Sequence, residues 1–363
     1  MTARADHDFV EPGMMLAERS PMPASRLLFH RPEAASESAL TFCRGNARLA
    51  LAAACVALEQ GNKAVLAIVL ETLGSAYAAA GTLALYTSDA KQGWLSGGCW
   101  EPEISRRVGE ASSLNRIGWM EIDTREDESL LSGSATGCRG RSRLVLLPLH
   151  VLPGCSTFLG TWLAGHCSLQ LGLNADGSVE MATGQVKQGW IVDSGPLDWP
   201  GEQTDWHHSL DRPPEVLVLG CGPEAPHLAS LLHGLGWQIR FAERRSGWRS
   251  NLSNLFEIAE DSAAGALSRR YLPDAALVMH HNFELDWQAL DAIATLPVPF
   301  VGLLGPRRRR EDLFKLLSVH QRESLLPRLR SPIGLNLGGS GPEAIALSIA
   351  AQLESWRNSL LGS

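Results

Sequence analysis

Two glycine-flanked cysteines are the side chains of this sequence best suited to binding a metal or a sulfur-bearing ligand. The first, Cys99, directly follows Gly97 and Gly98 and precedes the start of a predicted helix. A helix N-terminus favours the thiolate, and two glycines let a ligand approach the backbone closely. The pattern therefore suits a soft metal or a sulfur-bearing ligand. A small side chain packed beneath a glycine turn is the alternative, and these residues alone do not separate the two.

The second of these cysteines, Cys138, lies between Gly137 and Arg139, and Arg141 follows. Nearby cations lower the pKa of a thiol and can also hold a phosphate, so this loop is a second candidate site. The chain has seven cysteines in all and no C-x-x-C pair. A structural zinc site or a disulfide framework is therefore not expected.

A third candidate site is the turn that holds Gly220 and Gly222. It follows an apolar run and opens a predicted helix, as a dinucleotide-binding turn does. Ala225 replaces the third glycine of that pattern, and Glu243 matches the acidic residue expected about 20 residues later. The turn predicts a bound nucleotide or a pterin-like phosphate. A strand-to-helix turn without a ligand is the alternative.

Three further patterns carry weaker signals. Arg307 begins a run of four arginines after a predicted strand, which is either a solvated helix face or a source of one phosphate contact. The adjacent His280 and His281 point to opposite faces of a strand, which disfavours a metal site. Ser75 lacks the G-x-S-x-G elbow, so a hydrolase nucleophile is not expected.

The elements that must position these residues differ between the two halves of the chain. The first half mixes helices, strands and a hairpin, which is α+β in character. The elements predicted there are helices over 49–59 and 102–110, strands over 64–70, 82–87, 93–96 and 142–149, and a β-hairpin over 157–181 with its turn at 174–177.

The second half alternates strands with helices, which predicts a doubly wound parallel sheet with helices on its faces. The elements predicted there are strands over 215–219, 238–243, 275–280 and 300–304, and helices over 224–235, 286–295, 308–319 and 342–356. Residues 1–40 are predicted to form an extension and 196–214 a linker. The domains are thus expected over 41–195 and 215–363.

Length and composition agree with a globular protein of two domains. The chain has 363 residues, of which 45% are hydrophobic, and its net charge of -7 argues against broad binding of nucleic acid or of an anionic membrane surface. No apolar run approaches the roughly 20 residues of a membrane-spanning helix. The first 26 residues lack the apolar core of a secretory signal, so the cytoplasm is the expected location.

Taken together, the motifs resemble one family, the XdhC/CoxI accessory proteins of molybdenum hydroxylases. Their order and spacing extend over roughly residues 45 to 356. The motifs that carry the resemblance are residues 67–75, 96–101, 137–140, 218–222, 301–308, 332–337 and 342–349.

The resemblance implies an α/β protein with an N-terminal XdhC/CoxI-type domain that handles a cofactor and a C-terminal Rossmann-like domain. It implies binding of the molybdenum cofactor, as molybdopterin or its dinucleotide form, and exchange of an oxo for a sulfido ligand together with a cysteine desulfurase. The cofactor would then be inserted into a molybdenum hydroxylase apoenzyme, such as xanthine dehydrogenase or an aldehyde or carbon monoxide oxidoreductase. A molybdopterin nucleotidyltransferase as a further partner, a homodimer, and no turnover of its own belong to the same expectation.

The resemblance also ranks the candidate residues. Cys99 becomes the first contact to the cofactor and to its molybdenum, and Cys138 becomes the second. The remaining cofactor-binding candidates are Gly74, Ser75, Gly97, Gly98, Glu101, Gly220, Gly222, Glu243 and Arg307.

Several departures from the family pattern open two other interpretations. No basic residue follows Ser75 before Gly81, Arg139 replaces a glycine, and Glu243 begins a Glu-Arg-Arg sequence where Asp-Pro-Arg is usual. One alternative is a scaffold that bridges the desulfurase and the target enzyme without binding cofactor. The other is an NAD(P)-dependent oxidoreductase, which Gly220, Gly222 and Glu243 support.

Overall fold

The architecture is described from a computed structural model over residues 46–125, 139–201, 203–250, 252, 256, 258–259, 261–268 and 271–361. The predicted extension 1–40 and the candidate Cys138 lie outside the described residues. Among the described residues, no helix is both long enough and apolar enough to cross a lipid bilayer.

The first sheet is antiparallel and has five strands in the order β3-β2-β1-β5-β4. Its strands are β1 Ala64–Gly74, β2 Leu83–Thr87, β3 Lys91–Gln92, β4 Gly118–Asp123 and β5 Gly140–Pro148. The central strand β1 is buried on both faces over its first seven residues, which explains why its sequence is a continuous apolar run rather than an alternating one.

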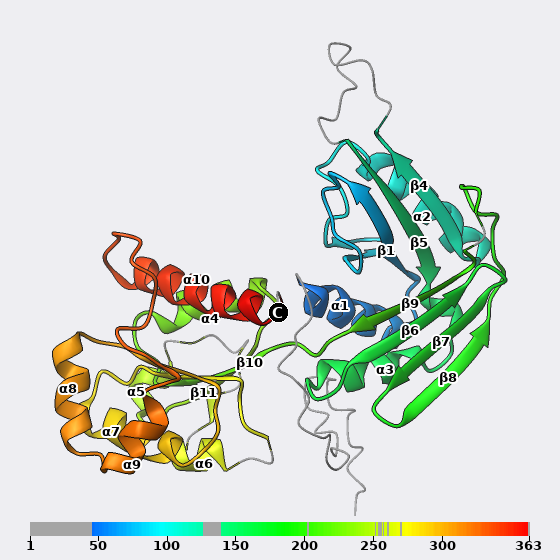
Figure 1. Ribbon diagram of the computed structural model, residues 1–363. Helices are drawn as coiled ribbons and strands as arrows, with labels where there is room; N and C mark the ends of the chain where they lie inside the picture. Colours follow the sequence, from blue (N-terminus) through cyan, green and yellow to red (C-terminus); the bar gives the residue numbers. More distant parts are fainter. Residues whose placement is uncertain are drawn as a thin grey trace, which may run out of the picture. The chain divides into compact units, whose positions relative to one another are not determined.

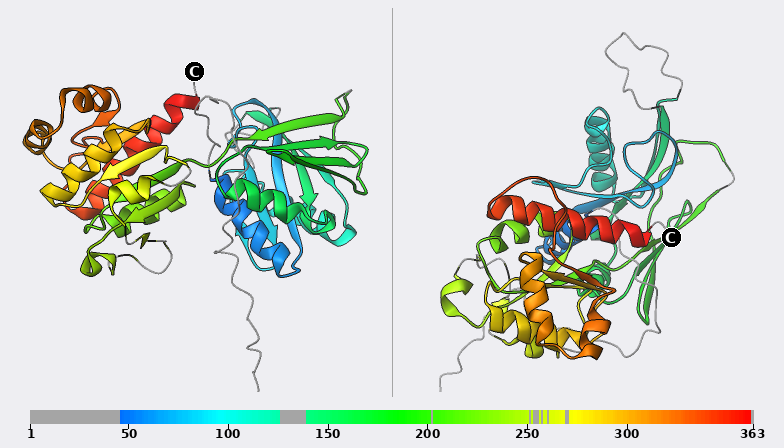
Figure 2. Two further views of the ribbon diagram at one scale, coloured as in Figure 1. Left: turned by 90° about the horizontal axis from the view of Figure 1, so that it is seen from below. Right: turned by 60° about the vertical axis from the view of Figure 1, so that its left-hand side comes forward.

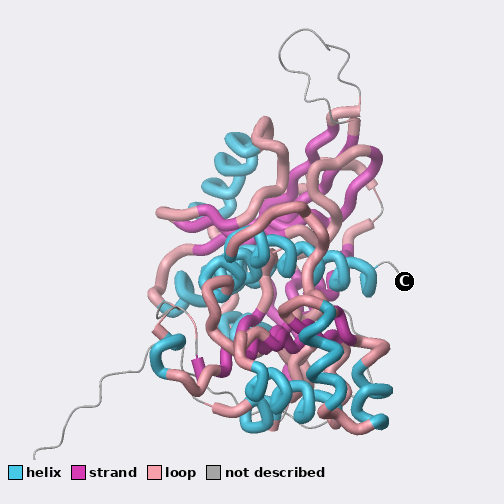
Figure 3. The backbone as a smooth tube through the Cα atoms, turned by 90° about the vertical axis from the view of Figure 1, so that its left-hand side faces the viewer, coloured by secondary structure: helices cyan, strands magenta, loops and turns pink. Residues whose placement is uncertain are grey.

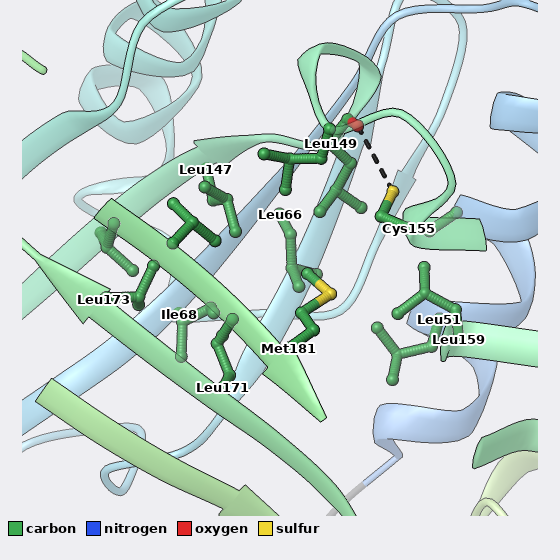
Figure 4. Close-up of a cluster of buried hydrophobic side chains, with 14 of the residues drawn as sticks. Leu51, Leu66, Ile68, Leu147, Leu149, Cys155, Leu159, Leu171, Leu173 and Met181 are labelled. Atoms are coloured by element: carbon green, nitrogen blue, oxygen red, sulfur yellow. Dashed lines mark hydrogen bonds between the residues drawn. The ribbon is translucent and has the colours of Figure 1, made fainter. Parts of the chain in front are cut away.

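Each face of this sheet packs against a different layer. Val65, Ala67 and Val69 of β1 lie in the core beneath helix α2, Glu101–Leu114. Leu66 and Ile68 point the other way, into a core shared with helices α1, Ala47–Glu59, and α3, Cys155–Leu163, and with a second sheet. Figure 4 shows this core, where the Cys155 thiol donates to the Leu149 carbonyl at 3.4 Å. The α2 layer therefore places the Cys99 turn next to one face of the sheet.

The second sheet has four antiparallel strands in the order β8-β7-β6-β9. Its strands are β6 Leu169–Asn174, β7 Ser178–Thr183, β8 Val186–Ile191 and β9 Asp205–Leu210. The short 3-10 helix η2, Leu149–Val151, precedes α3, and α3 lies beside α1 (Figure 2). The residues of β6 and β7 that alternate inward close the shared core.

The third sheet is parallel, with six strands in the order β12-β11-β10-β13-β14-β15. Figure 3 shows its strands between helices, and Figure 1 shows α10 along α4. Helices α4 and α10 cover one face, and α6, α7, α8 and α9 contribute to the core on the other. The strands are β10 Glu215–Leu219, β11 Gln238–Ala242, β12 Ile258–Ala259, β13 Ala275–Val278, β14 Phe300–Leu303 and β15 Leu329–Arg330. The helices are α4 Ala225–Gly234, α5 Ser246–Arg249, α6 Ala263–Leu267, α7 Phe283–Ala294, α8 Arg307–Lys315, α9 Val319–Leu325 and α10 Pro342–Leu361.

The strand order confirms the predicted α/β class, with a mixed N-terminal region and a doubly wound parallel sheet. Its winding reverses between β10 and β13, because the chain leaves β10 toward β11 and later returns on the other side of β10. Open α/β sheets bind ligands at this switch point, outside the carboxyl ends of the strands. The turn after β10 occupies that position.

Four local predictions are wrong. The strand predicted over 93–96 lies earlier, at β3, and the first part of the hairpin predicted over 157–181 is helix α3. The predicted linker 196–214 contains β9, which pairs with β6. The helix predicted over 308–319 is two helices, because Ser318 caps a new one through a capping box with Gln321.

The hairpin turn between β6 and β7 gives a test of the second sheet. Gly177 has φ 95, and a Cβ there would lie 2.0 Å from the Val192 carbonyl oxygen. Gly184 has φ 58, and a Cβ there would meet no described atom within 4 Å. We predict that Gly177→Ala destabilises by roughly 2 to 5 kcal/mol, through strain plus a backbone clash, and Gly184→Ala by only about 1 to 2 kcal/mol. Urea denaturation followed by tryptophan fluorescence measures both, and equal effects would contradict the described turn.

Candidate functional site

The Cys99 turn joins β3 to α2 and presents its thiol to solvent. Cys99 is an exposed free cysteine, two residues before the first residue of α2. Gly98 has φ 114, a conformation that glycine adopts without strain, and a Cβ there would meet no described atom within 4 Å. The space beside this turn is therefore open to a ligand.

The buried carboxylate of Glu101 fixes the conformation of this turn. Its Oε1 accepts hydrogen bonds from the N–H groups of Leu95 and Ser96, at 3.3 and 3.1 Å, and from the Ser96 hydroxyl at 3.0 Å. Ser96 Oγ in turn accepts from the Gly98 N–H at 3.3 Å. The carboxylate thus reaches back and holds the backbone that carries Cys99. The predicted direct contact between Glu101 and a cofactor stays a prediction.

Two side chains from the sheet complete the shell around Glu101. Its Oε2 accepts from the Tyr86 hydroxyl at 3.1 Å and forms an ion pair with Lys91. Burial acts to raise the pKa of Glu101, but the hydrogen bonds and the charge of Lys91 outweigh it, so this pKa is lowered. Burial and the Glu101 charge raise the pKa of Tyr86. Lys91 also lies 3.8 Å from the ring centroid of Trp94, a cation–π contact.

A groove opens beside this network, between the residues that join β2 to β3 and helix α2. Its volume is about 680 Å³, within the range of small-molecule sites. Tyr86 and Lys91 line it together with Lys63, and serines of α2 form its other wall. The residues that hold the Cys99 turn thus also border a concave surface.

Three candidate loops of the N-terminal region meet at Gly74 and Ser75. The Ser75 N–H donates to the Arg139 carbonyl at 3.2 Å, and a Cβ on Gly140 would lie 2.5 Å from the Ser75 carbonyl oxygen. A Cβ on Gly97 would lie 3.6 Å from the ring of Tyr77. The loop that follows β1 therefore contacts both the Cys99 turn and the start of β5. The prediction for Cys138, just before Arg139, falls outside the described residues.

The second candidate site lies after β10, at the switch point of the parallel sheet. Gly220 has φ 110, and a Cβ there would lie 2.6 Å from the Met279 carbonyl oxygen, so the turn passes directly against the end of β13. The thiol of Cys221 is fully buried, and burial together with the charge of Glu243 raises its pKa to about 12. A thiol in that state is protonated at neutral pH, so Cys221 packs rather than reacts.

Glu243, the predicted acidic residue after β11, is fully buried and paired within the chain. It accepts from the Cys221 N–H at 3.1 Å and forms a bidentate ion pair with Arg245, at 2.8 and 2.7 Å. Burial acts to raise the pKa of Glu243, but Arg245 outweighs it and the pKa is lowered. The carboxylate therefore stays ionised as an anchor between the glycine turn and the Arg245 loop.

A second buried carboxylate lies at the start of α4. Glu224 accepts from His281 Nε2 at 3.0 Å, and these two side chains occupy the space into which a Cβ on Gly222 would project. The hydrogen bond to Glu224 raises the pKa of His281, against the effect of burial. Asp286 adds to this rise and Arg309 opposes it. The pair places a compensated charge beside the second glycine.

The arginines at the start of α8 differ in their surroundings. The predicted site residue Arg307 is exposed, whereas Arg309 pairs with the buried Asp286 at 2.6 Å. Asp286 also accepts from His280, through its N–H and Nδ1, both at 3.1 Å. Within the described residues, no group of three or more His, Cys, Asp or Glu has a metal-binding arrangement.

The structure thus groups the predicted residues within each region and adds partners that sequence patterns missed. Tyr86 lies on β2 and Lys91 on β3, whereas their partner Glu101 begins helix α2, so no local sequence spacing indicates these contacts. Arg245 was visible two residues after Glu243, but its role depends on the pairing seen here. The direct ligand roles of Cys99, the glycines and Arg307 stay predictions.

Two family models match the chain. The model described as the XdhC and CoxI family covers residues 57–116, which include the Gly74 loop and the Cys99 turn. The model described as the XdhC Rossmann domain covers residues 216–353, which include the turn after β10 and the start of α8.

One relative and one solved structure are similar over most of the chain, and a second relative is similar over part of it. A protein of Bacillus subtilis (strain 168), named as a probable xanthine dehydrogenase subunit, is 24% identical over 324 residues, 82% of this chain and 94% of that protein. The "Uncharacterized protein YqeB" of Escherichia coli (strain K12) is 28% identical over 154 residues, 41% of this chain and 28% of that protein. A crystal structure of a xanthine dehydrogenase from Bacillus halodurans has a TM-score of 0.65 at 23% identity, and it covers 84% of this chain and 96% of that one. At this identity the structural likeness shows a shared fold.

The Glu101 network gives a test of how the Cys99 turn is held. We predict that Glu101→Gln, which keeps the side-chain size but removes the charge, increases amide hydrogen exchange at Leu95, Ser96 and Gly98. The exposed Glu103 of the same helix is the matched control, because its carboxylate pairs only with Arg106 and Arg107. Glu103→Gln should leave exchange in the turn unchanged. Equal exchange in both variants would contradict the anchoring role of Glu101.

The Glu224 and His281 pair gives a test by pH. The raised pKa of His281 means that its stabilisation is complete below about 6.5, its ordinary value, and is lost as pH rises through the folded value. The lowered pKa of Glu224 means that its stabilisation is present above about 4.5 and is lost as pH falls. We predict that His281→Gln costs most stability between these values. Because His281 is 40% exposed, the cost should stay under about 1 kcal/mol.

Urea denaturation at several pH values measures this cost. The control is His227→Gln on α4, since His227 is 46% exposed and lies 3.5 Å from a still more exposed carboxylate, that of Glu343. The difference in free energy of unfolding between His227→Gln and the parent protein should not change with pH over the same range. A His281→Gln cost that grows above pH 8 would contradict the pairing.

Proposed function

Because this chain belongs to the XdhC/CoxI family, we propose that it is an accessory protein of a molybdenum hydroxylase and binds the molybdenum cofactor as cargo at the Cys99 turn. The proposed target is of the xanthine dehydrogenase type, since the Bacillus subtilis relative is named as part of that enzyme. Aldehyde and carbon monoxide oxidoreductases are the other members of the proposed target class.

The single observation that carries the proposal is an exposed thiol on a turn whose backbone is held by a buried carboxylate. Cys99 supplies an exposed sulfur donor two residues before the first residue of α2. Glu101 keeps the turn in place, and the space beside Gly98 is open. A cysteine sulfur is a soft metal ligand, so this turn fits a metal centre that takes sulfur ligands. The cofactor would supply that centre, and this chain would bind and orient it.

The contrast among the described cysteines supports the choice of Cys99. Burial raises the pKa of Cys55 to about 12 and that of Cys155 to about 11. Cys221 is buried in the same way, and Cys167 is half-buried with its sulfur 2.9 Å from the Thr183 hydroxyl. Cys99 is the exposed cysteine within the described ranges. A ligand from solvent can therefore reach its sulfur directly.

The remaining parts of the proposal concern partners. A cysteine desulfurase would supply sulfur for the sulfido ligand, and a molybdenum hydroxylase apoenzyme would receive the cofactor. A molybdopterin nucleotidyltransferase, a homodimer and a cytoplasmic location complete the proposal. A scaffold that binds no cofactor is the alternative function, and the experiment below separates the two.

We predict that Cys99→Ala lowers cofactor retention by at least roughly 10- to 100-fold. Loss of a residue that only supports a metal ligand already lowers metal affinity by that factor. The protein is incubated anaerobically with molybdenum cofactor and separated by gel filtration, and molybdenum in the protein peak is measured by mass spectrometry. Cys99→Ser tests whether a hydroxyl of similar size can replace the thiol. Cys167→Ala is the matched control and should retain cofactor as the parent does.

Far-UV circular dichroism confirms that each variant is folded. A folded Cys99→Ala that retains cofactor at the parent level would remove Cys99 from the site. If the parent protein itself retains none, the scaffold interpretation replaces the proposed function.

A further inference from the structure

We propose that the carboxyl edge of the parallel sheet carries a binding site for a phosphomonoester group. Arg245 is the central residue of this site, and the site binds a phosphorylated ribose in preference to an unphosphorylated ribose diol. If the bound phosphate belongs to the molybdenum cofactor, this inference rests on the proposed function and deepens it.

All acceptor positions of the Glu243 carboxylate are already used. Its Oε1 accepts from the N–H and the Nε of Arg245, at 2.9 and 2.8 Å. Its Oε2 accepts from the Cys221 N–H at 3.1 Å and from Arg245 Nη2 at 2.7 Å. A carboxylate offers about four lone-pair positions, and these four donors take them. In dinucleotide sites an acidic residue at this place accepts from ribose hydroxyls, and Glu243 has no position left to do so.

The same pairing leaves one edge of the Arg245 guanidinium available. Arg245 uses Nε and Nη2 toward Glu243, and among the described residues no acceptor is bound to its Nη1. Its side chain is 27% exposed and lies 5.0 Å from the ring centroid of Trp248. A guanidinium fixed on one edge and open on the other suits a phosphate, because planar N–H donors match its oxygens.

The charges around Arg245 favour an anion. Arg244 precedes it, and Arg249 donates through Nη1 to the carbonyls of Glu243 and Arg244, at 3.5 and 3.4 Å. Among the described residues of this loop, three arginines therefore lie around the one buried carboxylate of Glu243, although the chain as a whole carries a net charge of -7. Arginine beside this position accommodates the 2′-phosphate of NADP in other Rossmann sites. The loop is therefore suited to a doubly charged monoester.

The neighbouring glycine turn differs from a pyrophosphate cradle. The start of α4, where the pyrophosphate of a dinucleotide would lie, already has the Glu224 carboxylate, 5% exposed and paired with His281. A second negative group there would be repelled. The recognition of a phosphate on this edge is thus expected at Arg245 rather than at the helix start.

Two ligands can supply the recognised group. One is the terminal phosphate of the molybdopterin form of the cofactor, and the other is the 2′-phosphate of an adenine nucleotide. Both are phosphomonoesters, whereas the dinucleotide form of the cofactor and NAD⁺ carry only diphosphate diesters. The experiment uses these pairs, which differ in this group.

Isothermal titration calorimetry of the full-length chain compares NADP⁺ with NAD⁺. We expect NADP⁺ to bind at least tenfold more tightly, and inorganic phosphate to compete with it. Arg245→Gln should weaken NADP⁺ binding roughly 10- to 100-fold, because a hydrogen bond to a charged group is lost. NAD⁺ should bind this variant no more weakly, because Glu243 regains free acceptors. Arg322→Gln on α9 is the matched control and should change neither affinity.

Glu243 acts as a positioning residue for Arg245. Glu243→Gln should lower the ratio of NADP⁺ to NAD⁺ affinity, a readout that general loosening of the fold would not change in one direction only. If Arg245→Gln proves unstable by circular dichroism, Arg245→Lys keeps the charge without the bidentate pair and gives the same comparison. Equal affinity of the parent for NADP⁺ and NAD⁺, binding of neither, or no effect of substitution at Arg245 would overturn the inference.

Anaerobic competition distinguishes the two sources. Displacement of NADP⁺ by the molybdopterin form but not by the dinucleotide form supports the inference with the cofactor as the source. Binding of NADP⁺ that depends on Arg245 but is unaffected by cofactor supports it with a nucleotide as the source. If Cys99→Ala loses cofactor while Arg245→Gln changes nothing, the inference fails and the proposed function stands. If Arg245→Gln loses NADP⁺ while Cys99→Ala retains cofactor, the role of Cys99 fails and the inference stands.

Discussion

The burial of the Glu101 carboxylate is the constraint on which the rest of the N-terminal site depends. An ionised group removed from water must be compensated by donors and by opposite charge. Here the donors come from three places: the turn backbone at Leu95 and Ser96, the hydroxyl of Tyr86 on β2, and Lys91 on β3. Satisfying one carboxylate therefore joins two strands, a turn and a helix. The turn that results directs its backbone N–H groups inward, toward Glu101, and leaves the Cys99 thiol exposed.

Buried carboxylates at the carboxyl edge of the parallel sheet are compensated in the same way. Glu224, Glu243 and Asp286 are all buried there, and each has a cationic or histidine partner. The partners of Glu224 and Asp286 come from other segments, whereas Arg245 lies two residues after Glu243. The pairs connect the glycine turn to the ends of β11 and β13 and to the start of α8. Their charges are largely used within the fold. Arg245 uses only Nε and Nη2 toward Glu243 among the described residues, so its Nη1 is the donor that this edge offers to an anion.

Sequence patterns predicted the architecture better than they predicted the contacts. Alternation of apolar runs and helices indicated the parallel sheet, because helices on both faces require continuously apolar strands. The segment that begins α3 was ambiguous, since a short apolar run suits a strand or a buried helix equally. The polar strand β9 was hidden in a segment rich in Trp, Pro and His, and only its pairing with β6 defines it. The sequence shows the charges of Glu101 and Glu243 but not the partners that neutralise them, and the direct contacts of both residues to a ligand stay predictions.

The glycine-flanked cysteines show how position in the fold decides chemistry that sequence leaves open. Cys221 and Cys99 both follow glycine, and both precede a helix. The first lies under the parallel sheet's helix layer, next to the anionic Glu243, and both effects favour its neutral thiol. The second is exposed to solvent just before α2, where a ligand can reach its sulfur. The same local pattern therefore produces a packing residue in one region and an accessible sulfur donor in the other.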